Sequence, residues 1–364
     1  MPAPGTAIPE LKPDQLDLAR LIRAGDSVLW GQGTAEPLTL TEALVGQRAA
    51  IGHIDVFIGP SWSPTLQPEH ADVLSLKSYC AIGNNRRLAK AGALEIVPCH
   101  YSKIPGLVAD GGIACDVVFL QLSAENANGE FSLGLANDYL LDATRRARVV
   151  IAEINDRLPW THANGELKDL RIDYLLRSSR PPLDAPALRT GEVERRIAAY
   201  ASAFIGDGAV LEMGIGAIPD AIIASLADRR DLGIHSGILG DSAVDLIESG
   251  AVTNARKRVA PGVSIAGLLF GSGKLYEFAD RNPALRLCPA AVTHGTAVLA
   301  QLDGLVAINS AIEVDLTGQV NAEVLGHEYI GAVGGQGDFV RGAGLARGHR
   351  RPALDRARPI RYRA

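Results

Sequence analysis

The sequence predicts an α/β protein with a mostly parallel sheet, and three observations support this fold class. Short apolar runs rich in Val, Ile and Leu recur along the chain and suit strands buried on both faces. Amphipathic stretches of helical length lie between them, which is typical of βαβ units. The 39 glycines allow several tight turns between strands and helices. The 364 residues exceed one ordinary core and indicate two domains of roughly 150–200 residues each.

The expected elements alternate in chain order. Each strand is an apolar run, and each helix has an apolar stripe or begins at a residue that favours helix starts. The expected strands are Ile54–Ile58, Leu94–Val97, Val117–Leu122, Val149–Glu153, Val210–Met213, Leu232–His235 and Leu305–Asn309. The expected helices are Asn137–Arg146, Glu192–Phe204, Pro219–Ala227 and Asp241–Glu248.

A proline-rich stretch marks the predicted domain boundary. Residues 178–186 read Ser-Ser-Arg-Pro-Pro-Leu-Asp-Ala-Pro, and prolines interrupt both helices and central strands. The predicted domains are therefore 1–185 and 186–346. Residues 347–364 carry seven arginines and few large apolar side chains. We expect this tail to be poorly ordered or weakly packed, because so many arginines cannot be buried without partners.

Composition and charge exclude several function classes. The net charge of -5 and pI near 5.9 argue against a nucleic-acid partner, which favours a basic face. No apolar run reaches the ~18–20 residues that span a bilayer, and the N-terminus lacks the pattern of a signal peptide. We therefore expect a cytoplasmic protein with no membrane partner. The cysteines show no zinc-like spacing, so we expect no metal and four reduced thiols at Cys80, Cys99, Cys115 and Cys288.

The strongest local signal is a glycine turn after an apolar strand. Residues 210–220 read Val-Leu-Glu-Met-Gly-Ile-Gly-Ala-Ile-Pro-Asp, and Pro219 suits a first helical turn. Glycines let backbone approach a ligand closely, and the free N–H groups of a helix start favour an anion or a carbonyl oxygen. A tight turn without a ligand would have the same pattern. The spacing differs from the dinucleotide-binding fingerprint, since no third glycine follows in register.

Two further clusters lie near the C-terminal end. Residues 331–342 contain Gly334, Gly335 and Gly337, which could aim consecutive N–H groups at one oxyanion or form only a surface loop. Residues 309–323 carry polar groups at close intervals. There Glu313 is either a base or a surface carboxylate, and residues 315–318 could form a hairpin turn.

These three clusters, in this order, resemble the acetyl-CoA hydrolase/transferase family, which includes 4-hydroxybutyrate and butyrate–acetate CoA-transferases. The resemblance extends from about Asp26 to Ala346. It implies two similar open α/β domains, with the coenzyme A portion of an acyl-CoA substrate bound between them. It also implies a carboxylate as the second substrate, and a homodimer. It also implies that the following residues lie near coenzyme A: Gly214, Ile215, Gly216, Ala217, Ile218, Ile312, Gly334 and Gly335.

The resemblance also implies a covalent mechanism that this sequence departs from. In the family a glutamate attacks the thioester and becomes a glutamyl-CoA thioester, which splits a difficult exchange into two steps. The family's glutamate follows a Gly-Ile-His-Ser/Thr stretch, which here is Gly233–Ser236. In this sequence Gly237 occupies the position of that glutamate. Restoring glutamate there is expected to create or raise transferase activity. The family also continues for several tens of residues past the second glycine cluster, so the second domain is expected to be incomplete.

Three functions remain open at the level of sequence. In a CoA-transferase that moves CoA from a short-chain acyl-CoA to a carboxylate, another carboxylate would replace the missing one, with Asp241, Glu313 and Glu323 as candidates. In an acyl-CoA hydrolase, water would occupy the vacated space, with His235 or Asp241 as base. The third possibility is a coenzyme A binder or inactive homologue. The ordinary structural roles are a helix N-cap for Asp241, a core histidine for His235 and a surface carboxylate for Glu313 and Glu323.

Overall fold

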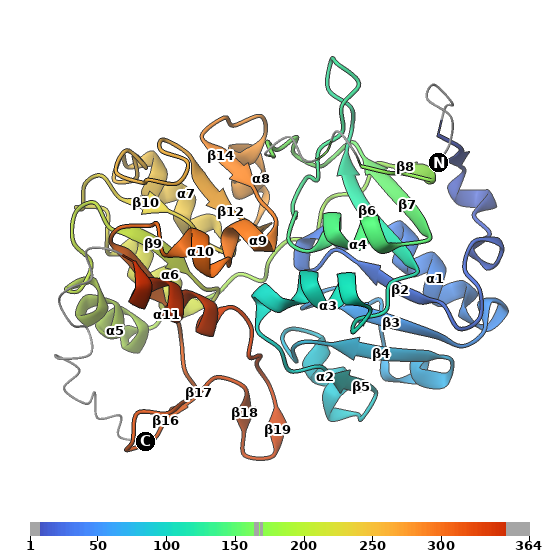
Figure 1. Ribbon diagram of the computed structural model, residues 1–364, viewed down its shortest axis with the longest axis horizontal. Helices are drawn as coiled ribbons and strands as arrows, with labels where there is room; N and C mark the ends of the chain where they lie inside the picture. The colour runs from blue at the N-terminus through green and yellow to red at the C-terminus, as the bar shows by residue number, and fades with distance from the viewer. Residues whose placement is uncertain (1–7, 164–166, 168–169, 347–364) are drawn as a thin grey trace.

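The computed structural model describes residues 8–163, 167 and 170–346, and the arginine-rich tail lies outside them. Figure 1 shows two lobes side by side, joined by the segment 179–191. We call the described residues up to 178 the first lobe and residues 192–346 the second lobe.

The first lobe is built on one sheet of eight strands in the order β1-β8-β7-β6-β2-β3-β4-β5, and every pair is parallel. Its strands are β1 (Glu10–Leu11), β2 (Ser27–Trp30), β3 (Ile54–Ile58), β4 (Leu74–Ser78), β5 (Leu94–Ile96), β6 (Val117–Ser123), β7 (Val149–Asn155) and β8 (Tyr174–Ser178). Its α-helices are α1 (Leu38–Ile51), α2 (Asn85–Lys90), α3 (Ile104–Asp110) and α4 (Leu140–Arg146).

Alternation along the central strands separates two apolar cores. In β6, Val117 and Phe119 pack with helix α1 on one face, whereas Val118 and Leu120 pack toward α3 and α4 on the other. All seven residues of β6 are buried. Helices therefore cover both faces of a parallel sheet, as its apolar strands predict.

The second lobe has a smaller parallel sheet. Strand β9 (Val210–Met213) lies between β10 (Gly233–Ile234) and β15 (Leu305–Ile308), and two parallel pairs, β11 with β13 and β12 with β14, continue the same layer. These pairs are β11 (Ile238–Leu239), β13 (Leu268–Leu269), β12 (Ser264–Ala266) and β14 (Leu285–Leu287). The helices are α5 (Glu192–Ser202), α6 (Ala217–Ala224), α7 (Asp241–Glu248), α8 (Gly273–Ala279), α9 (Ala290–Thr293), α10 (Thr296–Leu299) and α11 (Gln336–Leu345).

Two short hairpins precede α11 and extend away from the lobes in Figure 1. They pair β16 (Glu313–Val314) with β17 (Val320–Asn321) and β18 (Val324–Leu325) with β19 (Glu328–Tyr329). The expected hairpin turn at 315–318 is confirmed, since the Asp315 N–H donates to the Gln319 carbonyl at 3.0 Å.

Several expected boundaries are wrong by a few residues. Helix α4 begins at Leu140 rather than Asn137, because Asn137 and Asp138 contact the second lobe: the Asn137 N–H donates to Gly267 O, and Asp138 has a left-handed φ of 46°. Helix α6 begins at Ala217, so Pro219 is its third residue, which the first turn still tolerates. Strands β2 and β4 are not among the expected strands: β2 has only four residues, and in β4 polar residues alternate with leucines.

Loops at the carboxyl ends of the strands join the lobes. The segment after β5 forms a bridge between His100 and Gly334, and the segment after β4 bridges Cys80 to Ala332. In addition, Ala136 pairs with Leu268 of β13. The carboxyl ends of parallel strands from both lobes therefore meet at one junction, where α/β proteins place their ligands.

No helix among the described residues is long and apolar enough to cross a membrane.

Candidate active site

A cavity of about 170 Å³ lies at this junction. Residues of both lobes line it: the first lobe contributes side chains from beyond the ends of β2 to β5, and the second contributes the ends of β9, β10 and β15 and the start of α11. The lining comprises Gln32, Pro60, Trp62, Tyr79, Ile82, Tyr101, Glu212, Met213, Gly214, Ile215, Gly237, Ile238, Leu268, Phe270, His294, Asn309, Ala332, Gly334, Gly335, Gln336 and Phe339.

The two glycine clusters of the sequence meet in this cavity. Gly214 and Ile215 lie between the end of β9 and the start of α6, so the predicted turn between strand and helix is present. Gly334 and Gly335 line the opposite side, and Gly335 directly precedes α11. Gly334 has a φ of 53°, a conformation that glycine adopts without strain. Both helices therefore direct their N-terminal ends, with free N–H groups, toward the junction.

The remaining residues expected near coenzyme A lie outside the lining. Gly216, with a φ of 135°, precedes α6, and Ala217 and Ile218 form its first turn. Ile312 lies at the base of the β16–β17 hairpin, where its N–H donates to the Asn321 carbonyl. These four residues are consequently not part of the cavity surface.

Gly237 lies opposite a bulge in the second sheet, which Gly267 and Leu268 form. Its carbonyl oxygen accepts hydrogen bonds from the N–H groups of both Gly267 and Leu268, each at 3.0 Å. Two residues facing one acceptor define a β-bulge, a feature that changes the direction of a side chain and is common beside active sites. A Cβ atom at position 237 would point at the imidazole of His294, 2.6 Å from Cε1 and 2.7 Å from Nε2.

His294 fills the space between Gly237 and Gly335. A Cβ atom on Gly335 would also lie 2.6 Å from its Nε2, and its ring centroid is 4.5 Å from that of Tyr101 and 4.7 Å from that of Phe339. Nδ1 is 2.8 Å from the hydroxyl of Thr293. Burial lowers the pKa of His294 to about 4, so the ring is neutral at pH 7. Sequence reasoning missed it because a lone histidine after a helix carries no motif.

Glu212 is a second residue that sequence reasoning missed. It is 4% exposed at the end of β9, and burial raises the pKa of its carboxyl to about 8. The side-chain amide of Asn309 donates to its Oε2 at 2.9 Å, and the backbone N–H of Ile308 donates to the same oxygen at 3.1 Å. Among the described residues that line the cavity, Glu212 is the only one with a carboxyl side chain.

A polar network forms the wall contributed by the first lobe. The Gln32 side chain donates to the Tyr101 hydroxyl at 2.8 Å and to Asp138 Oδ2 at 2.7 Å, while the Tyr79 hydroxyl donates to Gln32 Oε1 at 2.7 Å. Burial raises the pKa of Asp138 to about 7. These contacts hold the Tyr79 and Tyr101 hydroxyls in fixed positions, and the Tyr101 ring lies beside His294.

The structure does not bring the three sequence-predicted catalytic residues together. His235 is fully buried outside the lining; its Nε2 is 3.0 Å from the Val292 carbonyl, and burial lowers its pKa to about 3. Asp241 is the first residue of α7 rather than its N-cap, and both its oxygens accept from the Ser272 N–H at 3.0 and 3.1 Å. Glu313 is exposed on the β16–β17 hairpin and accepts from Asn321.

Glu323, the remaining candidate carboxylate, lies outside the lining and accepts a hydrogen bond from the Tyr329 hydroxyl at 2.8 Å. The described residues also contain no group of three or more His, Cys, Asp or Glu side chains that could hold a metal ion.

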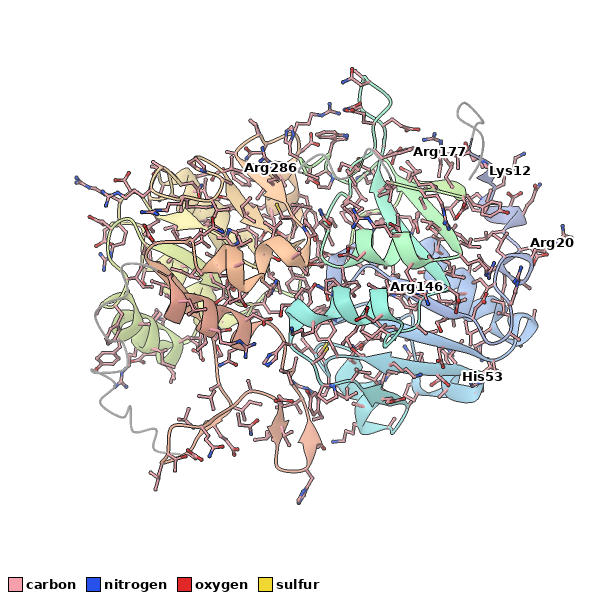
Figure 2. The ribbon with its side chains drawn as sticks, in the orientation of Figure 1. Lys12, Arg20, His53, Arg146, Arg177 and Arg286 are labelled. Atoms are coloured by element: carbon pink, nitrogen blue, oxygen red, sulfur yellow. The ribbon has the colours of Figure 1, made fainter. Side chains whose placement is uncertain are left out.

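Basic side chains distant from the cavity form surface ion pairs. Figure 2 shows Lys12 and Arg20 toward the end of the first lobe that faces away from the second, and Arg177 along the upper edge of the first lobe. Arg20 pairs with Asp17 at 2.9 Å and Arg177 with Glu125 at 2.7 Å. Exposed pairs of this kind stabilise a fold little.

Comparison with known proteins identifies the family. Residues 13–178 match the model of the acetyl-CoA hydrolase/transferase N-terminal domain, and residues 271–353 match that of the C-terminal domain. The chain is 32% identical over 335 residues to the 4-hydroxybutyrate coenzyme A transferase of Clostridium kluyveri, covering 88% of this chain and 75% of that protein. The chain belongs to the acetyl-CoA hydrolase/transferase family.

Solved structures agree with this family assignment. RipA from Yersinia pestis superposes with a TM-score of 0.85 at 30% identity, covering 93% of this chain and 80% of that one. The 4-hydroxybutyrate CoA-transferase of Porphyromonas gingivalis gives a TM-score of 0.76 at 27% identity, with coverages of 93% and 79%. The α/β fold class expected from the sequence is thus confirmed, and CoA thioesters are the substrates on which this family acts.

Proposed function

We propose that this protein transfers coenzyme A between a short-chain acyl-CoA and a carboxylate. The observation that carries the proposal is the meeting of Gly214, Gly237 and Gly335 in one cavity between the lobes. A thioester placed there would have the glycine turn before α6 on one side and the start of α11 on the other. Backbone N–H groups of such segments favour a carbonyl oxygen that gains negative charge.

The cavity favours a small acyl group. Its volume of about 170 Å³ is below the ~300–1,000 Å³ of pockets that enclose drug-sized ligands. Aromatic and aliphatic side chains, among them Trp62, Phe270 and Phe339, surround the space. In the proposed complex the acyl group occupies this enclosure, while the larger nucleotide portion of coenzyme A extends outside it.

An exchange assay tests the proposal. Purified protein is incubated with acetyl-CoA and butyrate, and the acyl-CoA species are separated by chromatography. Butyryl-CoA formation at the expense of acetyl-CoA supports transfer. Release of free coenzyme A that does not depend on butyrate contradicts transfer and supports hydrolysis.

Hydrolysis is the second candidate function, and the position of His294 favours it. Its neutral imidazole stands where a side chain at position 237 would begin, and a neutral imidazole can accept a proton from water. In that reaction water would replace the carboxylate as the attacking group.

A homodimer and a cytoplasmic location are further parts of the proposal. The hairpins before α11 expose Val314, Leu316, Val320 and Leu325, which a second copy of the chain could cover. Cys80, Cys99 and Cys115 form no disulfide bond, which suits a reducing compartment. Light scattering of the purified protein tests the dimer, and a monomeric mass at micromolar concentration would contradict it; cell fractionation tests the location.

A further inference from the structure

The proposed transfer reaction needs a carboxylate beside the thioester, and position 237 does not supply one. A covalent route through a glutamyl thioester begins with attack by a carboxylate oxygen, and glycine has no side chain. The carboxylates of Asp241 and Glu313 form hydrogen bonds outside the cavity. The attacking group must therefore be sought among the residues that line the cavity itself.

We propose that Glu212 is the nucleophile of this protein, an inference that rests on the proposed transfer function. Glu212 is the only carboxyl-bearing residue in the described lining. It lies two residues before Gly214, on the strand adjacent to the one that leads to Gly237, where Leu211 pairs with Ile234. A carboxylate at the end of β9 therefore reaches the cavity to which position 237 also points.

The hydrogen bonds of Glu212 suit a positioned nucleophile. Both donors, the Asn309 amide and the Ile308 N–H, bind Oε2, which leaves Oε1 available to a ligand in the cavity. Their bonds fix the carboxyl group in one orientation and stabilise its ionised form. Burial removes water that would otherwise compete with the thioester for the attacking oxygen.

The steps balance without an additional reactant. Oε1 of ionised Glu212 attacks the thioester carbon, the carbon–sulfur bond breaks, and coenzyme A leaves as a thiolate from a mixed anhydride. The thiolate attacks Cδ of Glu212, the Cδ–Oε1 bond breaks, and the donor acid leaves with that oxygen. An acceptor carboxylate then attacks the glutamyl thioester, and the thiolate attacks the acceptor's carbonyl carbon in the new anhydride. Acceptor acyl-CoA leaves, and the carboxylate of Glu212 is regenerated with one acceptor oxygen.

Adduct mapping tests the assignment on the unaltered protein. The protein is incubated with acetyl-CoA alone, digested under mildly acidic conditions and analysed by mass spectrometry. We expect the peptide containing Glu212 to gain the mass of coenzyme A less one water, and hydroxylamine to remove the adduct. An adduct on another carboxyl residue would overturn the role of Glu212 while leaving transfer intact.

A pair of variants completes the test. Glu212→Gln keeps the shape of the side chain and an oxygen acceptor for both donors, so we expect the protein to fold and to bind acetyl-CoA. The rate of butyryl-CoA formation should fall at least about 100-fold, on the order expected for removing a group required for chemistry. Glu277→Gln, an exposed carboxylate on α8, is the matched control and should keep full activity. Exchange by Glu212→Gln at the unaltered rate overturns the assignment alone. Absence of both adduct and exchange in the unaltered protein overturns the assignment and the proposed function together.

Discussion

Adding one methyl group at position 237 tests the packing at the centre of the site. In Gly237→Ala the new Cβ would lie 2.6 Å from Cε1 and 2.7 Å from Nε2 of His294, well inside van der Waals contact. The imidazole has little room to move, because Tyr101 and Phe339 lie on either side and Nδ1 is within hydrogen-bond distance of Thr293. Overpacking of this kind costs about 1–3 kcal/mol of unfolding free energy.

Thermal unfolding measures this cost. For a lobe of this size, 1 kcal/mol shifts Tm by roughly 2–4 °C, so Gly237→Ala should lower Tm by several degrees. Gly240→Ala is the matched control, because its Cβ would meet only the Phe270 carbonyl at an ordinary 3.5 Å. In a His294→Ala background, the cost of Gly237→Ala should disappear, since the clashing atoms are absent. Equal Tm losses in both backgrounds, or no loss in the original protein, would refute the packing described here.

The same contact changes what restoring the family glutamate is expected to do. The sequence alone favours Gly237→Glu as a single substitution that creates activity, but the imidazole occupies the first atoms of the new side chain. The double variant Gly237→Glu/His294→Ala should therefore form a coenzyme A adduct at position 237 more readily than the single variant. Equal adduct yields would show that the imidazole moves aside freely.

Three further outcomes follow from the site. Asp338→Asn should raise the KM for acyl-CoA and lower the free energy of unfolding by about 1–3 kcal/mol. The reason is that buried Asp338 links the two lobes, accepting hydrogen bonds from the N–H of Ser102 at 3.0 Å and from the Ser102 hydroxyl at 2.8 Å. An unchanged KM would contradict this. Exchange should fall as pH drops below about 8, since only ionised Glu212 attacks and burial raises its pKa to that value; a rate flat from pH 6 to 8 would contradict it. A thiol reagent should modify half-buried Cys99 first, whereas Cys80, whose pKa burial raises to about 11, should resist; peptide mapping of the modified protein reads this order directly.

The sequence was informative wherever a local pattern reflects local physics. Apolar runs such as Val117–Leu122 marked buried parallel strands, and the observed strand is one residue longer. The glycine turn after Met213 was correctly placed between a strand and a helix. Both features depend on neighbours in the chain, so the chain order of residue types is sufficient to predict them.

The cavity could not be assembled in this way. In the sequence Glu212 is only one residue of an apolar strand, because its importance depends on Asn309, at a strand end nearly 100 residues away. His294 matters because Gly237 and Gly335 have no side chains and so leave space for its ring. Conversely, nearness in sequence favours Asp241 and Glu313, but their side chains form hydrogen bonds elsewhere. Residues that meet only through the junction of two lobes leave no local pattern.

Oxygen tracing most directly tests the claim that this site transfers coenzyme A through an enzyme carboxylate. Acetyl-CoA and butyrate are incubated with the protein in ¹⁸O-labelled water, and the released acetate is analysed by mass spectrometry. In transfer through Glu212, butyrate gives one oxygen to the Glu212 carboxyl group, and that oxygen leaves with acetate in a later turnover. We therefore expect acetate without label from water, formed in step with butyryl-CoA. Acetate that gains one labelled oxygen per turnover, with no butyryl-CoA formed, would contradict transfer through Glu212 and assign the site to hydrolysis.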